Sequence, residues 1–112
     1  MGKLSLNTGQ YVFKAGDKSD EVFLLVEGAV GIFLPTNDTQ KPNHVIEVNE
    51  IFGEMGVIEG KLRMADARCM SSATIMSISK DQFQNKIESS DPFIRGLIRI
   101  LSARVRSLQK NT

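Results

Sequence analysis

The chain has 112 residues, of which 41% are hydrophobic and 24% charged, as expected for one globular domain with a single core. Its only cysteine, Cys69, excludes an internal disulfide, and the first residues contain no apolar run long enough for a signal peptide or a membrane span. We therefore expect a single domain over residues 1–112 in the cytoplasm, with no membrane segment.

The formal net charge of +1 is unevenly distributed. Residues 91–112 contain five of the 14 basic groups and one of the 13 acidic groups, which leaves the first 90 residues acidic. Four arginines in this tail could indicate nucleic-acid binding, but a solvent-exposed helix face gives the same count. We favour the solvent-exposed face.

Residues 9–78 are expected to form antiparallel β structure, because short runs rich in Val, Ile and Phe alternate with glycine and polar turns. Residues 21–34 predict two strands that meet in a tight turn at Glu27–Gly28, where glycine tolerates a positive φ. Residues 35–43 contain two prolines and predict an exposed, mobile hairpin tip. Residues 44–51 and 72–79 predict further strands.

Two helices are expected over about residues 80–110. Ser79 and Gln82 resemble a capping box before the first helix. Asp91 can cap the second helix and Pro92 can occupy its first position, where a missing N–H costs nothing. Apolar residues then recur at helical spacing: Ile94, Leu97, Ile98, Leu101, Val105 and Leu108. This stripe predicts core packing, or a homodimer or effector contact through the helix at residues 92–110.

The segment "FGEMGVIEGKLRMADARC" at residues 52–69 has the composition of an anion site. Gly60 predicts the C-terminal cap of a very short helix that begins near Met55, with Gly53 and Gly56 at its N-terminal end. Free backbone N–H groups at such an end attract anions, and residues without side chains allow an anion to approach the backbone.

Arg63 follows the short helix closely and can provide a planar cation that matches two phosphate oxygens. Glu54 would be repelled by that anion unless it accepts hydrogen bonds from hydroxyls such as those of a ribose. The two residues therefore suit a sugar phosphate. An ion pair between them that braces a tight turn is an equally good interpretation of these residues alone.

The motifs occur in an order that resembles the cyclic nucleotide-binding domain family over residues 9–108: "GD" at 16–17, "LVEGAVGIF" at 25–33, "FGEMG" at 52–56, "RMA" at 63–65 and "LSARVRSL" at 101–108. The resemblance implies a mainly β fold, an antiparallel, jelly-roll-like β-roll of about eight strands. A short cassette helix and C-terminal helices complete the implied fold.

The resemblance also implies a phosphate-binding cassette at residues 52–66. Glu54 would bind the ribose 2′-hydroxyl and Arg63 the exocyclic phosphate oxygens. Backbone amides beside both would complete the site, which gives the implied ligand-binding set as Gly53, Glu54, Met55, Gly56, Arg63, Met64 and Ala65. Ile46 and Val48 could contact the base, or could be ordinary core residues.

Two positions depart from the family pattern. Met64 stands where the family commonly has Ser, Thr or Ala, so no side-chain hydroxyl can reach a phosphate or a guanine edge, which favours cyclic AMP over cyclic GMP. The glycine usually found before "FGE" is absent and the region holds Asn49 and Glu50. Asn tolerates a left-handed backbone, so the turn can survive.

Other classes of function fit the sequence poorly. A metal-dependent β-roll enzyme would need two or three histidines, and this chain has only His44, which also leaves nucleophilic catalysis without a base. The sequence ends where related transcription factors carry a helix-turn-helix, so no DNA contact is expected. We expect a regulatory, non-enzymatic module in signal transduction, with cyclic AMP as its ligand and cyclic GMP as the second candidate, and without cofactor or metal. The alternative is an interaction or scaffold domain with a degenerate pocket.

Overall fold

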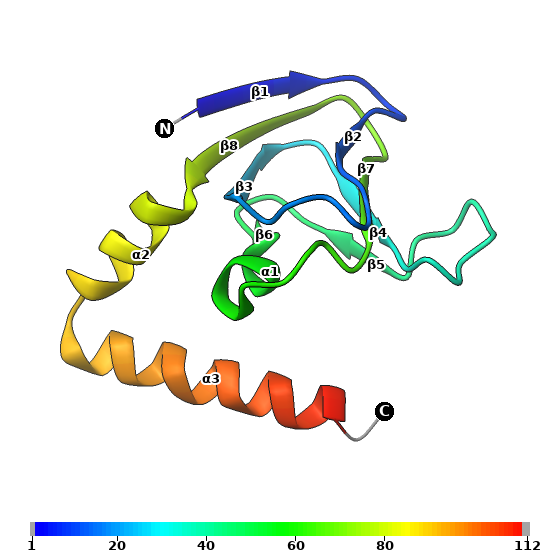
Figure 1. The fold of residues 1–112 in the computed structure, drawn as a ribbon. Coiled ribbons are helices and arrows are strands. Elements are labelled where there is room, and N and C mark those ends of the chain that lie inside the picture. The colour runs from blue at the N-terminus through cyan, green and yellow to red at the C-terminus, as the bar shows by residue number, and fades with distance from the viewer. Residues whose placement is uncertain (1, 111–112) are drawn as a thin grey trace. The chain divides into compact units, whose positions relative to one another are not determined.

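The structure is a computed structural model that describes residues 2–110. The described residues form two compact units, one up to Lys80 and one from Asp81 onward. The first unit contains eight strands and the short helix α1, Glu54–Glu59. The second contains α3, Pro92–Lys110, and all but the first residue of α2, Lys80–Glu88 (Figure 1).

The strands of the first unit form two four-stranded antiparallel sheets. One sheet has the order β1-β8-β3-β6 and the other β2-β7-β4-β5. The strands are β1 Gly2–Leu6, β2 Tyr11–Phe13, β3 Glu21–Glu27, β4 Val30–Phe33, β5 His44–Ile46, β6 Ile51–Phe52, β7 Asp66–Cys69 and β8 Ala73–Ser79. This architecture confirms the predicted mainly β fold with eight strands in the described part of the chain.

Apolar side chains from both sheets form one core. Leu25 and Ile75 lie opposite each other on β3 and β8, and both are fully buried together with Val30 of β4. The rings of Phe23 and Phe52 stack with their centroids 5.4 Å apart. Cys69 also lies in this core, and burial raises the pKa of its thiol.

The predicted hairpin between residues 21 and 34 is wrong, although both strands exist. β3 and β4 belong to different sheets, so the chain crosses from one sheet to the other at this point. Gly28 has the expected positive φ of 91°. A Cβ at Gly28 would lie 2.3 Å from the carbonyl oxygen of Ser72, so close approach of the backbone requires glycine as well.

The predicted strand at residues 44–51 is also wrong, because it is two strands in different sheets. β5 pairs with β4, whereas β6 pairs with β3. Between them Asn49 adopts a left-handed φ of 73°, as expected for the residue that replaces the family's glycine. The predicted roll began at residue 9 and therefore missed β1, which pairs with β8.

The exposed tip at residues 35–43 is confirmed as the end of a hairpin, since β4 and β5 pair directly. Asparagine side chains organise this tip. Asn43 Oδ1 accepts hydrogen bonds from the backbone N–H of Leu34 at 3.0 Å and from Asn37 Nδ2 at 2.8 Å. Asn37 Oδ1 in turn accepts from the Thr39 hydroxyl at 2.7 Å.

The second unit begins its long helix as predicted. The carboxylate of Asp91 accepts a hydrogen bond of 2.8 Å from the backbone N–H of Phe93, which caps α3. Ile94, Leu97 and Leu101 are each about half exposed. The side chains of Val105 and Leu108 are not among those that the structure describes. Neither α2 nor the described part of α3 is long and apolar enough to cross a membrane.

Candidate functional site

Segment 52–66 connects the end of β6 to the start of β7. Gly53, with a φ of 77°, precedes α1, and Gly60, with a φ of 66°, ends it through a hydrogen bond from its N–H to the carbonyl of Gly56. The sequence predicted this short helix and its glycine cap to within one residue. The two left-handed glycines allow the chain to turn into and out of a helix of only six residues.

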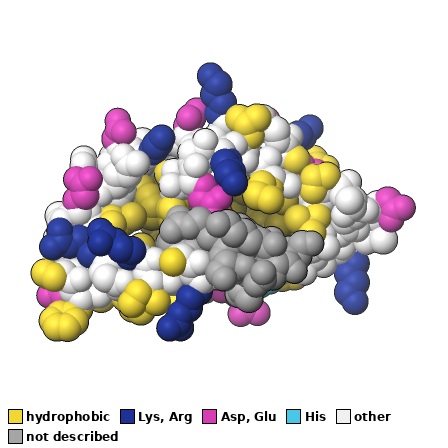
Figure 2. Space-filling model, turned by 60° about the horizontal axis from the view of Figure 1, so that its bottom comes forward, with side chains coloured by type: hydrophobic (Ala, Val, Ile, Leu, Met, Phe, Trp, Pro, Cys, Tyr) yellow, Lys and Arg dark blue, Asp and Glu magenta, His cyan; other side chains and the backbone are white. Residues whose placement is uncertain are grey.

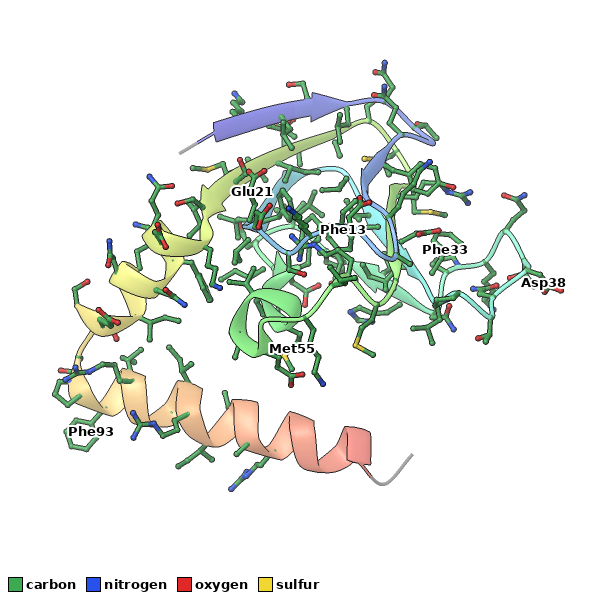
Figure 3. The ribbon with its side chains drawn as sticks, viewed as in Figure 1. Phe13, Glu21, Phe33, Asp38, Met55 and Phe93 are labelled. Carbon is green, nitrogen blue, oxygen red and sulfur yellow. The ribbon has the colours of Figure 1, made fainter. Side chains whose placement is uncertain are left out.

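The side chain of Arg63 is buried in the roll, with only 6% of its surface exposed. Its Nη1 donates to the carbonyl oxygen of Gly53 at 2.5 Å and its Nη2 to that of Glu21 at 2.6 Å. The guanidinium carbon lies 4.3 Å from the centroid of the Phe13 ring. Figure 3 shows Phe13 among the strands of the roll, whereas Met55 lies on α1.

The guanidinium of Arg63 forms no ion pair with a carboxylate of the described residues. In that part of the chain, the ion pair that forms is between Lys61 and Glu59, at 3.5 Å. Its Nε is buried without a hydrogen-bond partner. Burial lowers the pKa of this group, and nearby carboxylates oppose the shift: those of Asp20, Glu21, Asp17 and Glu54. Arginine stays protonated at accessible pH, so a buried cation remains without a direct counter-charge.

The ion pair between Glu54 and Arg63, which the sequence left open, is not formed. Glu54 lies in the first turn of α1 and is half-buried, as are Met55 and Gly56. Met64 is 62% exposed, whereas Ala65 is buried. Segment 52–66 therefore combines a buried cation with a helix turn that remains partly accessible.

The structure gives the two glycines a packing role that the sequence did not predict. A Cβ at Gly53 would lie 3.0 Å from Arg63 Nη1 and 3.1 Å from the Phe23 ring. A Cβ at Gly56 would lie 2.1 Å from the hydroxyl of Ser19. Both glycines therefore leave room for neighbouring side chains of the protein itself, in addition to any role that their backbone N–H groups have.

The two candidate base contacts are placed differently. Ile46, on β5, is buried in the core cluster, so its packing is that of an ordinary core residue. Val48 lies in the turn between β5 and β6 and is 46% exposed. Val45, Leu62 and Met64 are also exposed, and Figure 2 shows exposed hydrophobic side chains interspersed with charged ones on one face of the molecule.

Several residues at this site were not predicted from the sequence. Phe13 stacks on Arg63, the carbonyl of Glu21 accepts its hydrogen bond, and Ser19 packs against Gly56. These residues precede Arg63 by more than 40 positions and carry no local motif. The nearby "GD" at residues 16–17, part of the family resemblance, is the only sequence signal that points to this loop.

Comparison with known proteins identifies the family. The profile of the cyclic nucleotide-binding domain matches residues 3–90, and the chain belongs to this family. The family is a regulatory binding domain and not itself catalytic, although some relatives carry it within enzyme chains.

Two curated relatives illustrate the range of proteins that contain this domain. The cGMP-dependent protein kinase 2 of Mus musculus is 28% identical over 80 residues, which are 71% of this chain and 10% of the kinase. A cyclic nucleotide-gated potassium channel of Rhizobium etli is 30% identical over 93 residues, which are 81% of this chain and 24% of the channel. The chain thus spans less than a quarter of the length of these relatives.

Solved structures agree with this assignment. The cGMP-bound form of the EAL enzyme Bd1971 superposes with a TM-score of 0.80 at 25% identity, over 98% of this chain and 30% of that one. Its cAMP-bound form gives a TM-score of 0.76 at 27% identity, over 97% of this chain and 30% of that one. The Thermus thermophilus catabolite activator protein, at 20% identity and a TM-score of 0.79 over 98% of this chain and 52% of that one, shows the same fold.

Proposed function

We propose that this chain is a regulatory module that binds a cyclic nucleotide at segment 52–66, with cyclic AMP as the preferred ligand. The observation that carries the proposal is the guanidinium of Arg63, which is buried, unpaired with any carboxylate of the described residues and left with an Nε that has no hydrogen-bond partner there. A cyclic phosphodiester carries one negative charge at physiological pH and would supply the missing counter-charge. Arginine has five N–H donors, and the carbonyls of Gly53 and Glu21 use two of them.

The other residues of the segment have distinct roles in this proposal. Glu54 accepts a hydrogen bond from the ribose 2′-hydroxyl. The backbone N–H groups of Met55, Gly56, Met64 and Ala65 donate to the phosphate. Segment 52–66 acts in this way as a phosphate-binding cassette.

The preference for cyclic AMP rests on Met64. Its side chain has no hydroxyl with which to bond a guanine edge, and it is exposed rather than packed in the core. Val48 is the remaining candidate for contact with the base, because the side chain of Ile46 is buried in the core.

Cyclic AMP at 100 times its dissociation constant is expected to raise the melting temperature by about 10 °C, because binding to the native state alone adds about 2.7 kcal/mol. Thermal unfolding followed by circular dichroism, with cyclic AMP, cyclic GMP and 5′-AMP compared, measures this shift. We expect cyclic AMP to give the largest shift. An unchanged melting temperature at millimolar concentrations of both cyclic nucleotides would favour the alternative, a scaffold domain with a degenerate pocket.

We further propose that a second copy of the chain covers the apolar stripe of α3. Ile94, Leu97 and Leu101 recur at helical spacing and are each about half exposed. Sedimentation equilibrium at about 100 μM should therefore show a dimer, and Leu97→Glu should shift it to monomer because it would bury a charge. A monomer for the parent protein at that concentration would contradict this proposal.

A further inference from the structure

The loop between β2 and β3 is joined to residues 61–63 of segment 52–66 by three hydrogen bonds. The backbone N–H of Gly16 donates to the carbonyl of Arg63, and the N–H of Arg63 donates to the carbonyl of Asp17, both at 2.8 Å. The hydroxyl of Ser19 donates to the carbonyl of Lys61 at 2.6 Å. Of these three bonds, only the one from Ser19 depends on a side chain.

Ser19 also contacts α1. An added Cβ at Gly56 would lie 2.1 Å from the Ser19 hydroxyl and 2.9 Å from its Cβ, so Ser19 occupies the space that a side chain at position 56 would need. The carbonyl of Gly56 in turn accepts a hydrogen bond from the N–H of Lys61 at 2.9 Å. One serine therefore contacts both the helix and the irregular stretch that leads to Arg63.

We propose that Ser19 is a positioning residue for the nucleotide site, an inference that rests on the proposed function. Its hydroxyl fixes the backbone at Lys61, two residues before Arg63, and its side chain sets the position of α1 at Gly56. Ser19 thereby fixes the separation between the Arg63 guanidinium and the backbone N–H groups of Met55 and Gly56. Binding groups must be held to within about 0.5 Å of their productive geometry, so a small shift weakens binding.

Ser19→Ala should weaken cyclic AMP binding by about 3- to 10-fold, the range expected when one neutral hydrogen bond that positions a site is lost. Gly56→Ala should weaken it by more, because the new Cβ displaces either Ser19 or α1. The double variant Ser19→Gly with Gly56→Ala removes the clash with Ser19, leaves the 3.1 Å approach of the new Cβ to the carbonyl of Lys61, and should bind more tightly than Gly56→Ala alone. Non-additivity of this kind is the signature of residues in direct contact.

Two measurements separate positioning from a general loss of stability. Calorimetry gives the affinity for cyclic AMP, and the 15N–1H resonance of Arg63 Nε in the ligand-free protein reports whether the buried guanidinium has moved. Ser71→Ala is the matched control, because the hydroxyl of Ser71 accepts from the N–H of Ala29 and donates to the carbonyl of Ser72, outside segment 52–66. It should leave both readouts unchanged.

An Arg63 Nε resonance that does not move in Ser19→Ala would overturn the proposal, as would a Gly56→Ala variant that the second substitution fails to improve. If the parent protein does not bind cyclic AMP, the proposed function fails. The Arg63 resonance then still decides whether Ser19 positions the side chain.

Discussion

Arg63→Ala is expected to weaken cyclic nucleotide binding by about 30-fold to several thousand-fold, because loss of one partner of a buried charge pair costs about 2–5 kcal/mol. The substitution leaves the phosphate with backbone dipoles alone. Arg63→Lys should recover little affinity, since an ammonium cannot donate to the carbonyls of Gly53 and Glu21 and also span two phosphate oxygens. Calorimetry with cyclic AMP measures each variant.

The position of Arg63 also predicts a cost in stability, which the sequence did not. Alanine would remove the stacking on Phe13 and leave two backbone carbonyls without their donors. Arg63→Met is the better variant for separating the effects, because it keeps the apolar part of the side chain. It should lose as much affinity as Arg63→Ala and less stability in urea unfolding.

Arg68 provides a matched control for this experiment. Its guanidinium carbon lies 4.4 Å from the centroid of the Phe33 ring on β4, so it is also an arginine stacked on an aromatic ring. Arg68→Ala should leave affinity unchanged, because Arg68 lies outside segment 52–66.

Glu54→Gln should weaken cyclic AMP binding by an intermediate factor, about 10- to 100-fold, because it weakens a hydroxyl contact and keeps the charge pair. Binding by Arg63→Ala within threefold of the parent would exclude Arg63 as the phosphate ligand.

Gly28→Ala is expected to have the largest effect on folding, lowering the free energy of unfolding by more than about 3 kcal/mol. The new Cβ would lie 2.3 Å from the carbonyl oxygen of Ser72 and 2.9 Å from the Cα of Ala73, and backbone atoms cannot rotate away as a side chain can. A φ of 91° adds its own cost for a residue with a Cβ. Urea unfolding followed by circular dichroism measures the change.

Gly9→Ala separates the two contributions, because Gly9 has a similar φ of 87° and no atom within 4 Å of an added Cβ. We expect it to cost about 1–2 kcal/mol, the cost of the left-handed backbone alone. Equal decreases in the free energy of unfolding for Gly28→Ala and Gly9→Ala would mean that the crossing between the sheets at Gly28 is not tightly packed.

Signals that act over a few residues were readable from the sequence. The cap at Asp91, the start of α3 at Pro92 and the end of α1 at Gly60 depend on neighbouring residues alone, and the structure has all three. Pairing between strands depends on distant segments. The runs at 21–34 and 44–51 each look like one local unit, yet each divides its strands between the two sheets.

The candidate site shows the same division. The glycines, the short helix and the two charged residues were readable as a group because they lie within residues 53–63. The burial of Arg63 between carbonyls and a phenylalanine ring was not, because all its partners except Gly53 come from β2, β3 and the loop between them. For the same reason the sequence did not predict that Ser19 occupies the space beside Gly56.

The most direct test of the nucleotide site is a 15N–1H chemical-shift titration of the parent protein with cyclic AMP. We predict that the Nε resonance of Arg63 and the backbone resonances of Met55, Gly56, Met64 and Ala65 shift together with one dissociation constant, and that those of the hairpin tip at residues 35–43 stay in place. Saturable shifts confined to other parts of the chain, with the Arg63 Nε resonance unmoved, would contradict it.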